Sequence, residues 1–133
     1  MNKNKHSFHK IFETEWFSLE ATSDKFSDNQ PYYRLSCKED AAEILAVTDR
    51  NKIILVRQFR PAVGIYTLEF PAGYVGKSES NKEAIKRELE EETGFVCDSV
   101  IPMGSFKLFS SRANFTNHLF LEKGLKQKIQ KKI

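Results

Sequence analysis

Apolar residues recur along the chain in short alternating or continuous runs, which predict a protein built mainly of β-strands. The run AAEILAVT is separated from KIILVRQF by the turn sequence DRN, so these two runs are predicted to form a β-hairpin. In YTLEF, Tyr66, Leu68 and Phe70 alternate with polar residues, as in a half-buried strand. The predicted strands are residues 11–21, 32–37, 41–48, 52–59, 66–70, 105–109 and 117–122.

One segment has the signals of a long helix. Ser80 is followed three residues later by Glu83, which makes a capping box, and Gly94 suits the position just past a helix end. Together these signals predict a helix over residues 81–93. A single helix among many strands favours an α+β fold over repeating βαβ units.

The composition is typical of one soluble globular domain, with 133 residues, 40% hydrophobic and 29% charged. Residues 123–133 carry five lysines and no acid, so the net charge of +3 leaves about −2 for the other residues. We therefore expect no nucleic-acid partner and no membrane partner for the body of the protein. In the tail, Leu125, Ile129 and Ile133 recur every four residues. This stripe leaves open a short helix covering part of a sheet, a frayed end, or a membrane or nucleic-acid contact.

The cysteines and the start of the chain predict a cytoplasmic protein. Cys37 and Cys97 have neither metal-ligand spacing nor the count of a disulfide framework, so both are expected to be reduced. The start, MNKNKHSFHK, lacks the apolar segment of a signal peptide. No apolar run approaches the ~20 residues that a membrane span needs.

The predicted helix places some of its glutamates where a core should be. At ~100° per residue, Ala84, Ile85 and Leu89 define the core-facing side, and Glu88 and Glu92 fall within the same sector. Two carboxylates at i,i+4 repel each other, and partial burial adds to the cost. A divalent cation such as Mg²⁺ or Mn²⁺ would resolve both problems, because hard cations favour carboxylate oxygens. The alternatives are a structural cluster paired with arginine and a helix that lies on the surface.

The other charged residues of the helix fall outside that sector, with Glu91 at its edge. The charged residues predicted on the far side of the helix are Glu83, Lys86, Arg87 and Glu90. Ordinary i,i+4 ion pairs can form among them. Gly73 comes 15 residues before Glu88, and Glu79 lies just before the capping residue. A strand, a loop that begins with glycine and an acidic helix can therefore wrap around one ion, although Gly73 and Gly76 can equally serve only the turn.

Residues 73–95, GYVGKSESNKEAIKRELEEETGF, resemble the Nudix box, G-x5-E-x7-R-E-U-x-E-E-x-G-U, where U is aliphatic or aromatic. All nine constrained positions are filled: Gly73, Glu79, Arg87, Glu88, Leu89, Glu91, Glu92, Gly94 and Phe95. The resemblance implies the Nudix fold, a mixed β-sheet between helices, and a metal-dependent hydrolase. Carried over by position, Glu88 and Glu92 would be the main Mg²⁺ or Mn²⁺ ligands, with Glu91 assisting. Arg87 and Glu79 would orient and support them.

Upstream of the box, VRQFRPAVGIYTLEFPAG is similar to the corresponding segment of the ADP-ribose pyrophosphatase subgroup. That similarity implies hydrolysis of ADP-ribose to AMP and ribose 5-phosphate, with the Ala72 carbonyl as a further metal ligand. Arg60 would contact the substrate's phosphates, or else pair with Glu69 or another acid. Trp16 and Tyr32 would stack on adenine across a homodimer interface, or else pack in a core or sheet.

The resemblance divides the chain into residues 1–40, an antiparallel strand region with a candidate role in dimerisation, and residues 41–133, the Nudix hydrolase domain. Members of the subgroup continue through another strand and a second helix, so the C-terminal part of the fold is expected to be shortened. Their general base is a glutamate on a loop after the box, but the corresponding SSRANFT has no acid. Glu122 and His118 are the candidate substitutes. The alternatives are another nucleotide sugar or an oxidised nucleoside diphosphate as substrate, or a non-catalytic nucleotide-binding module.

Overall fold

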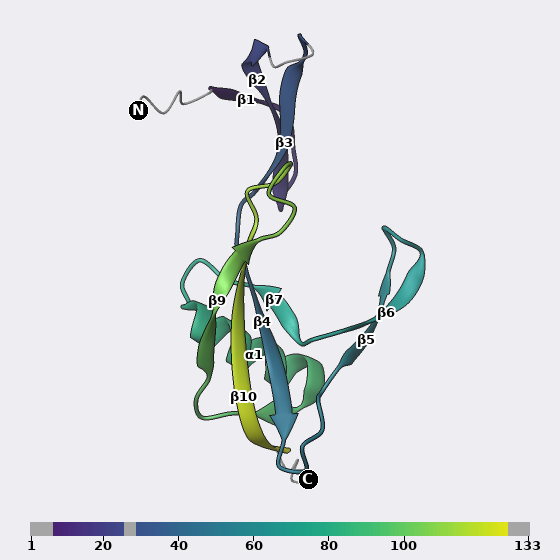
Figure 1. The fold of residues 1–133 in the computed structure, drawn as a ribbon, viewed down its shortest axis with the longest axis vertical. Helices are drawn as coiled ribbons and strands as arrows, with labels where there is room; N and C mark the ends of the chain where they lie inside the picture. Colours follow the sequence, from purple (N-terminus) through teal and green to yellow (C-terminus); the bar gives the residue numbers. More distant parts are fainter. Residues whose placement is uncertain (1–6, 26–28, 128–133) are drawn as a thin grey trace. The chain divides into compact units, whose positions relative to one another are not determined.

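The computed structural model describes residues 7–25 and 29–127 of the chain. The chain forms two compact units. The N-terminal unit consists of Met1–Glu39 and Lys107–Thr116, and the helix-containing unit consists of Asp40–Phe106 and Asn117–Ile133. Figure 1 draws both units with their strands and helix labelled, and each is described below by itself.

The N-terminal unit is built on a three-stranded antiparallel sheet in the order β1 (Phe8–Glu13), β2 (Phe17–Lys25) and β3 (Pro31–Cys37). The single strand predicted over residues 11–21 is wrong, because it is split between β1 and β2. Thr14 makes the turn between them: its hydroxyl accepts hydrogen bonds from the backbone N–H groups of Trp16 and Phe17. Such local side-chain bonding competes with a continuous ladder.

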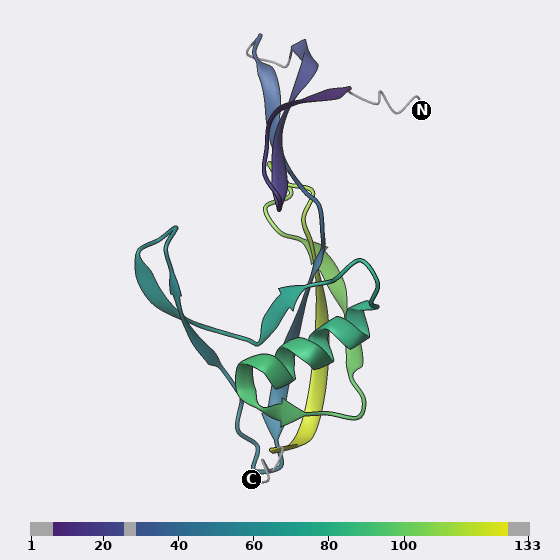
Figure 2. The same cartoon turned by 180° about the vertical axis from the view of Figure 1, so that it is seen from behind.

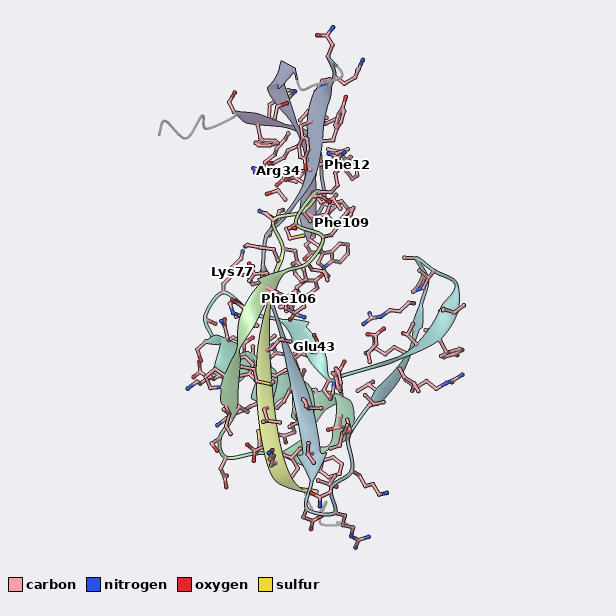
Figure 3. The ribbon with its side chains drawn as sticks, in the orientation of Figure 1. Phe12, Arg34, Glu43, Lys77, Phe106 and Phe109 are labelled. Atoms are coloured by element: carbon pink, nitrogen blue, oxygen red, sulfur yellow. The ribbon has the colours of Figure 1, made fainter. Side chains whose placement is uncertain are left out.

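Two contacts tie the N-terminal unit together across its sheet. Arg34, labelled in Figure 3, forms an ion pair with Glu20 at 2.8 Å and lies over the ring of Phe8. The segment Lys107–Thr116 joins the unit through an isolated bridge between Leu35 and Ala113.

The helix-containing unit is built on a five-stranded mixed sheet, with β7, β4, β10 and β8 in that order and β9 paired to β10. β4 runs parallel to β10 and antiparallel to β7, so the mixed sheet implied by the family resemblance is confirmed. The bounds of its strands are Ala41–Thr48 for β4, Ala72–Tyr74 for β7, Phe95–Val96 for β8, Ile101–Lys107 for β9 and Thr116–Gln127 for β10.

The hairpin predicted between residues 41–48 and 52–59 is wrong. The first hydrogen bonds of such a hairpin do form: the N–H of Thr48 donates to the backbone oxygen of Lys52, and the N–H of Ile54 donates to that of Ala46. After Ile54 the chain leaves β4. β5 (Val56–Arg60) pairs instead with β6 (Ile65–Glu69) as a separate two-stranded sheet. Local turn signals identified the turn but not the partner, because β4 pairs with β10 and β7 on its two sides.

The predicted half-buried face of β6 is also wrong. Its side chains alternate as predicted, but Tyr66 and Leu68 are 58% and 68% exposed, whereas Thr67 and Glu69 are the half-buried residues. The polar face of this hairpin is therefore the one turned toward the rest of the unit.

Helix α1 (Asn81–Thr93) has the predicted bounds and caps. The Ser80 hydroxyl accepts from the N–H of Glu83, whose carboxylate accepts in return from the N–H of Ser80. Gly94 ends the helix in the left-handed region at φ 73°, a conformation that glycine adopts without steric cost.

The core of this unit lies between α1 and one face of the mixed sheet, as Figure 2 shows from the side of the helix. Ala84, Ile85 and Leu89 are fully buried, which confirms the predicted core-facing side of α1. The side chains that meet them come from alternate positions of β4 and from β10: Ala42, Ile44, Ala46, Phe120 and Leu125.

The C-terminal helix considered for the basic tail does not begin where the apolar stripe begins. Leu125 lies in β10 and is buried in the core, with an exposed fraction of 3%. Ile129 and Ile133 lie outside the described residues.

Candidate functional site

β7 forms an edge of the mixed sheet and presents backbone groups outward. The N–H of Ile44 donates to the backbone oxygen of Pro71, and the N–H of Val75 donates to the backbone oxygen of Asp40. These two bonds identify which residue pairs of the β4–β7 ladder are hydrogen-bonded. Such pairs alternate with non-hydrogen-bonded ones, so the N–H and C=O of Ala72 point away from β4. The edge of the sheet thus offers one backbone donor and one backbone acceptor beside α1.

Glu92 uses that donor. Its Oε2 accepts from the N–H of Ala72 at 3.2 Å, and its Oε1 accepts from the side-chain amide of Gln58 at 2.9 Å. Burial raises the pKa of Glu92, and the nearby Glu88 carboxylate raises it further, whereas the two N–H donors lower it. The predicted placement of Glu92 toward the core is therefore observed, and the cost of that placement appears in its pKa.

Glu88 lies directly against β7. A Cβ added to Gly73 would come within 2.1 Å of the Glu88 Cδ atom, so the glycine leaves the space that this carboxylate fills. The Glu88 side chain is only 15% exposed. Gly73 therefore does more than satisfy a turn, because no larger residue fits beside Glu88 in this arrangement.

Arg87 lies at the centre of the remaining acids. Its guanidinium donates to Glu79 at 2.7 Å, to Glu88 at 2.6 Å and to Glu91 at 3.1 Å, and also to the backbone oxygen of Tyr74. These bonds lower the pKa of Glu79, and they raise the pKa of Arg87 further above its usual value. The predicted position of Arg87 on the far side of the helix is corrected, since its long side chain reaches round to the loop and β7.

These groups fit a divalent cation chemically. Glu88 and Glu92 supply hard carboxylate oxygens beside the outward C=O of Ala72, and Gly73 leaves room for them. Within residues 7–25 and 29–127, no three His, Cys, Asp or Glu side chains are already grouped to hold a metal ion. Arg87 pairs instead with Glu88 at 2.6 Å and with Glu91 at 3.1 Å.

Arg60 is paired with an acid, which is the alternative considered from the sequence. Its guanidinium donates to both carboxylate oxygens of Glu69 across the β5–β6 hairpin, and it is about half exposed. This pairing holds the pKa of Glu69 at about 2. The Arg60 charge also lowers the pKa of Glu92, so the hairpin and the glutamates of α1 share one electrostatic environment.

The aromatic candidates belong to the N-terminal unit. Trp16 lies in the turn after β1 and is 62% exposed, which excludes the core position considered for it within this chain. Tyr32 is half-buried in β3, and the guanidinium of Arg112 lies 4.4 Å from the centroid of its ring.

Among the described residues, neither candidate base makes a hydrogen bond or ion pair with Glu88 or Glu92. His118, Ala42 and Gly73 are at the same level of β10, β4 and β7, so His118 lies about 10 Å from Gly73 at the usual strand spacing. Its Nε2 is 3.4 Å from Asp40 Oδ2. Glu122 is four residues further along β10, where its charge adds to burial in raising the pKa of Cys97.

Gln58 is the site residue that the sequence did not reveal. It lies in the RQFRP segment, but a strand glutamine has no pattern that predicts a partner 34 residues away. Its position beside Arg60 at i+2 was the available signal, because alternate residues of a strand share a face.

A model of the NUDIX domain matches residues 38–131. The chain is 38% identical over 88 residues to a methanol dehydrogenase activator of Bacillus methanolicus, covering 66% of this chain and 48% of that protein. It is 39% identical over 85 residues to an ADP-ribose pyrophosphatase of Bacillus subtilis, covering 64% of this chain and 46% of that protein. The chain therefore spans about half the length of these curated relatives.

The fold is also found among solved structures. A crystal structure of an ADP compounds hydrolase matches 99% of this chain and 74% of its own, with a TM-score of 0.80 at 22% sequence identity. Within the part of the chain that the structure describes, no helix has the length and apolar character that crossing a membrane requires.

Proposed function

Because the chain belongs to the NUDIX domain family, we propose that it hydrolyses the diphosphate bond of a nucleoside diphosphate derivative. ADP-ribose, cleaved to AMP and ribose 5-phosphate, is the favoured substrate. The observation that carries the proposal is the meeting of two glutamates with β7: Glu92 accepts from the outward N–H of Ala72, and Glu88 fills the space beside Gly73. The name of the Bacillus subtilis relative, an ADP-ribose pyrophosphatase, supports the substrate class.

Mg²⁺ or Mn²⁺ is the proposed cofactor, and the chemistry of the donors supports it. Glu88 and Glu92 would hold the cation, with Glu91 and the Ala72 carbonyl as further ligands. When bound there, the cation neutralises charge on the diphosphate and lowers the pKa of an attacking water.

The chain's own residues would bind and orient the substrate. Arg87 and Glu79 hold Glu88 and Glu91 in position through the ion pairs described above. Arg60 would place positive charge against the phosphates as negative charge shifts in the transition state. Trp16 and Tyr32 are proposed to bind adenine, Trp16 because its ring is exposed.

The group that accepts the water's proton is proposed to be His118 or Glu122. The contact between His118 and Asp40 supports the histidine, because a carboxylate beside an imidazole orients the ring. Both residues lie away from Glu88, so either would need the substrate or a water chain as an intermediary.

We also propose a cytoplasmic homodimer formed through residues 1–40, with residues 41–133 as the hydrolase domain. Exposed apolar side chains on β1, Ile11 and Phe12, support an interface in this region. The lack of an acid in residues 110–116 favours one alternative, a nucleotide-binding module that does not hydrolyse its ligand.

The test is a hydrolysis panel of ADP-ribose, other nucleotide sugars and oxidised nucleoside diphosphates with Mg²⁺ and with Mn²⁺. We expect AMP from ADP-ribose, no product with EDTA, and a loss of kcat/KM of about 100-fold or more in Glu92→Gln. Glu90→Gln is the matched control, because Glu90 is an exposed acid of the same helix and should leave turnover unchanged. A ligand that raises the Tm without being consumed would instead identify a binding module.

A further inference from the structure

The β5–β6 hairpin is connected to the glutamates of α1 by one side chain. The hairpin forms a separate two-stranded sheet, drawn apart from the mixed sheet in Figure 1. Of the side-chain hydrogen bonds described for residues 56–69, the bond from Gln58 to Glu92 is the one that leaves the hairpin. The orientation of this hairpin toward α1 therefore depends on Gln58 more than on any backbone ladder.

Register places Gln58 on the polar face of the hairpin. Gln58 is opposite Thr67, and Arg60 and Glu69 follow on the same face. The hydroxyl of Thr67 donates to the backbone oxygen of Gln58 at 3.3 Å. The residue that reaches Glu92 and the residue proposed to bind phosphate are thus held side by side on one strand.

Glu92 receives one N–H on each carboxylate oxygen, from two different elements. Ala72 of β7 holds Oε2 and Gln58 of β5 holds Oε1. We propose that Gln58 is a positioning residue for Glu92: it fixes the plane of this carboxylate, whose remaining lone pairs would then be held ready for a divalent cation. This inference rests on the proposed function, because it assumes that Glu92 is a cation ligand.

The physical reason is that a carboxylate with only one donor rotates about its terminal bond. An aspartate or glutamate that binds a metal is normally held by a further hydrogen bond, and loss of such a partner costs about 10–100-fold in metal affinity or activity. The amide of Gln58 is also a neutral donor, so it adds no positive charge beside Glu92. A lysine at the same place would compete with the cation for the carboxylate.

The test compares Gln58→Met and Gln58→Ala with the wild-type chain in Mn²⁺ titrations followed by electron paramagnetic resonance, without substrate. Methionine keeps nearly the size of glutamine but has no N–H donor, so it separates hydrogen bonding from packing. We expect both variants to bind Mn²⁺ about 10-fold more weakly or worse. Leu68→Ala is the control, because Leu68 is 68% exposed on the opposite face of the same hairpin and should bind Mn²⁺ as the wild type does.

Turnover supplies a second readout. At low Mg²⁺, kcat/KM for ADP-ribose should fall in Gln58→Met, and a large excess of Mg²⁺ should restore it toward the wild-type value. A purely structural defect would not respond to the cation. Thermal melts of the cation-free proteins should coincide within the error of the measurement.

The outcomes separate the two proposals. If wild type and Gln58→Met bind Mn²⁺ equally, the positioning role of Gln58 is wrong while the proposed function stands. If the wild-type chain binds no Mn²⁺ and hydrolyses no compound of the panel, the proposed function is wrong, and the role of Gln58 is wrong with it.

Discussion

At Gly73 the lack of a Cβ atom makes room for the Glu88 carboxylate. The Glu88 carboxylate occupies the space that a Cβ on residue 73 would need. Because the clashing group is the end of a flexible side chain, an alanine at 73 would push the carboxylate aside and leave the fold in place. Position 73 should therefore affect ligand binding more than stability.

Gly73→Ala is predicted to weaken Mn²⁺ binding by about 10-fold or more, the effect expected when a metal ligand loses its support. The free energy of unfolding should change by only about 1 kcal/mol, the low end of the cost of overpacking, because the overlap is relieved by moving the end of one flexible side chain. Isothermal titration and urea denaturation measure the two effects.

A double-mutant cycle gives the control for this prediction. If Gly73→Ala acts through Glu88, it should have little further effect on Mn²⁺ binding in a Glu88→Gln background. Additive losses in the double variant would show that residue 73 acts by another route.

Residue positions that depend on helical periodicity could be predicted from the sequence, and those that depend on side-chain reach could not. The angle around α1 correctly placed Glu88 and Glu92 toward the sheet and Glu90 in solvent. Arg87 was misplaced because a side chain of its length leaves the direction of its Cβ to reach Glu79. Gln58 was missed because its partner is set by tertiary packing.

At the scale of elements, local signals predicted α1 fully and the strands only in part. Helix caps depend on residues within one turn of each helix end, so Ser80, Glu83 and Gly94 are enough to predict where α1 begins and ends. Strand partners are non-local, and β4 found both of its partners far along the chain, in β7 and β10. A turn sequence after β4 could not indicate this choice.

The β5–β6 hairpin is the element whose stability should depend on acid pH. Two strands alone are marginally stable, so the pair of Arg60 and Glu69 across them contributes to holding them together. The pKa of Glu69 is about 2 in the folded protein and near 4.5 in the unfolded chain. A carboxyl group with a lowered folded pKa contributes stability above the unfolded pKa, and that contribution is lost as the pH falls toward 2.

Glu69→Gln is therefore predicted to lower the free energy of unfolding at pH 7 by less than about 1 kcal/mol, since the pair is partly screened by solvent. The difference from the wild type should shrink as the pH falls from 4.5 toward 2. Urea denaturation at a series of pH values measures this difference in the free energy of unfolding. In an Arg60→Gln background, Glu69→Gln should no longer produce it. A gap that stays constant over this range would mean that the ion pair is not its cause.

At the scale of the whole molecule, the resemblance to the Nudix box predicted the sheet better than the patterns of single strands did. The mixed sheet followed from the resemblance of residues 73–95 to the Nudix box, and the α+β class followed from the single helix among many strands, although individual strands and pairings were wrong. The spacing of that box encodes a loop and a helix together, whereas single apolar runs encode only a local conformation. Both units also expose large apolar side chains, among them Phe12 in the N-terminal unit and Leu68 in the helix-containing unit.

Those exposed side chains lead to a prediction about assembly. If residues 1–40 form the dimer interface, sedimentation should give twice the 15.4 kDa mass of the chain. Phe12→Asp should weaken the dimer by about 10-fold or more, because it would bury an unpaired charge at the interface. Phe12, labelled in Figure 3, is 58% exposed, and Leu68→Asp, at a residue 68% exposed on the hairpin, is the matched control. Dissociation by Leu68→Asp but not by Phe12→Asp would move the interface to the hairpin, and a monomeric wild type would exclude the dimer.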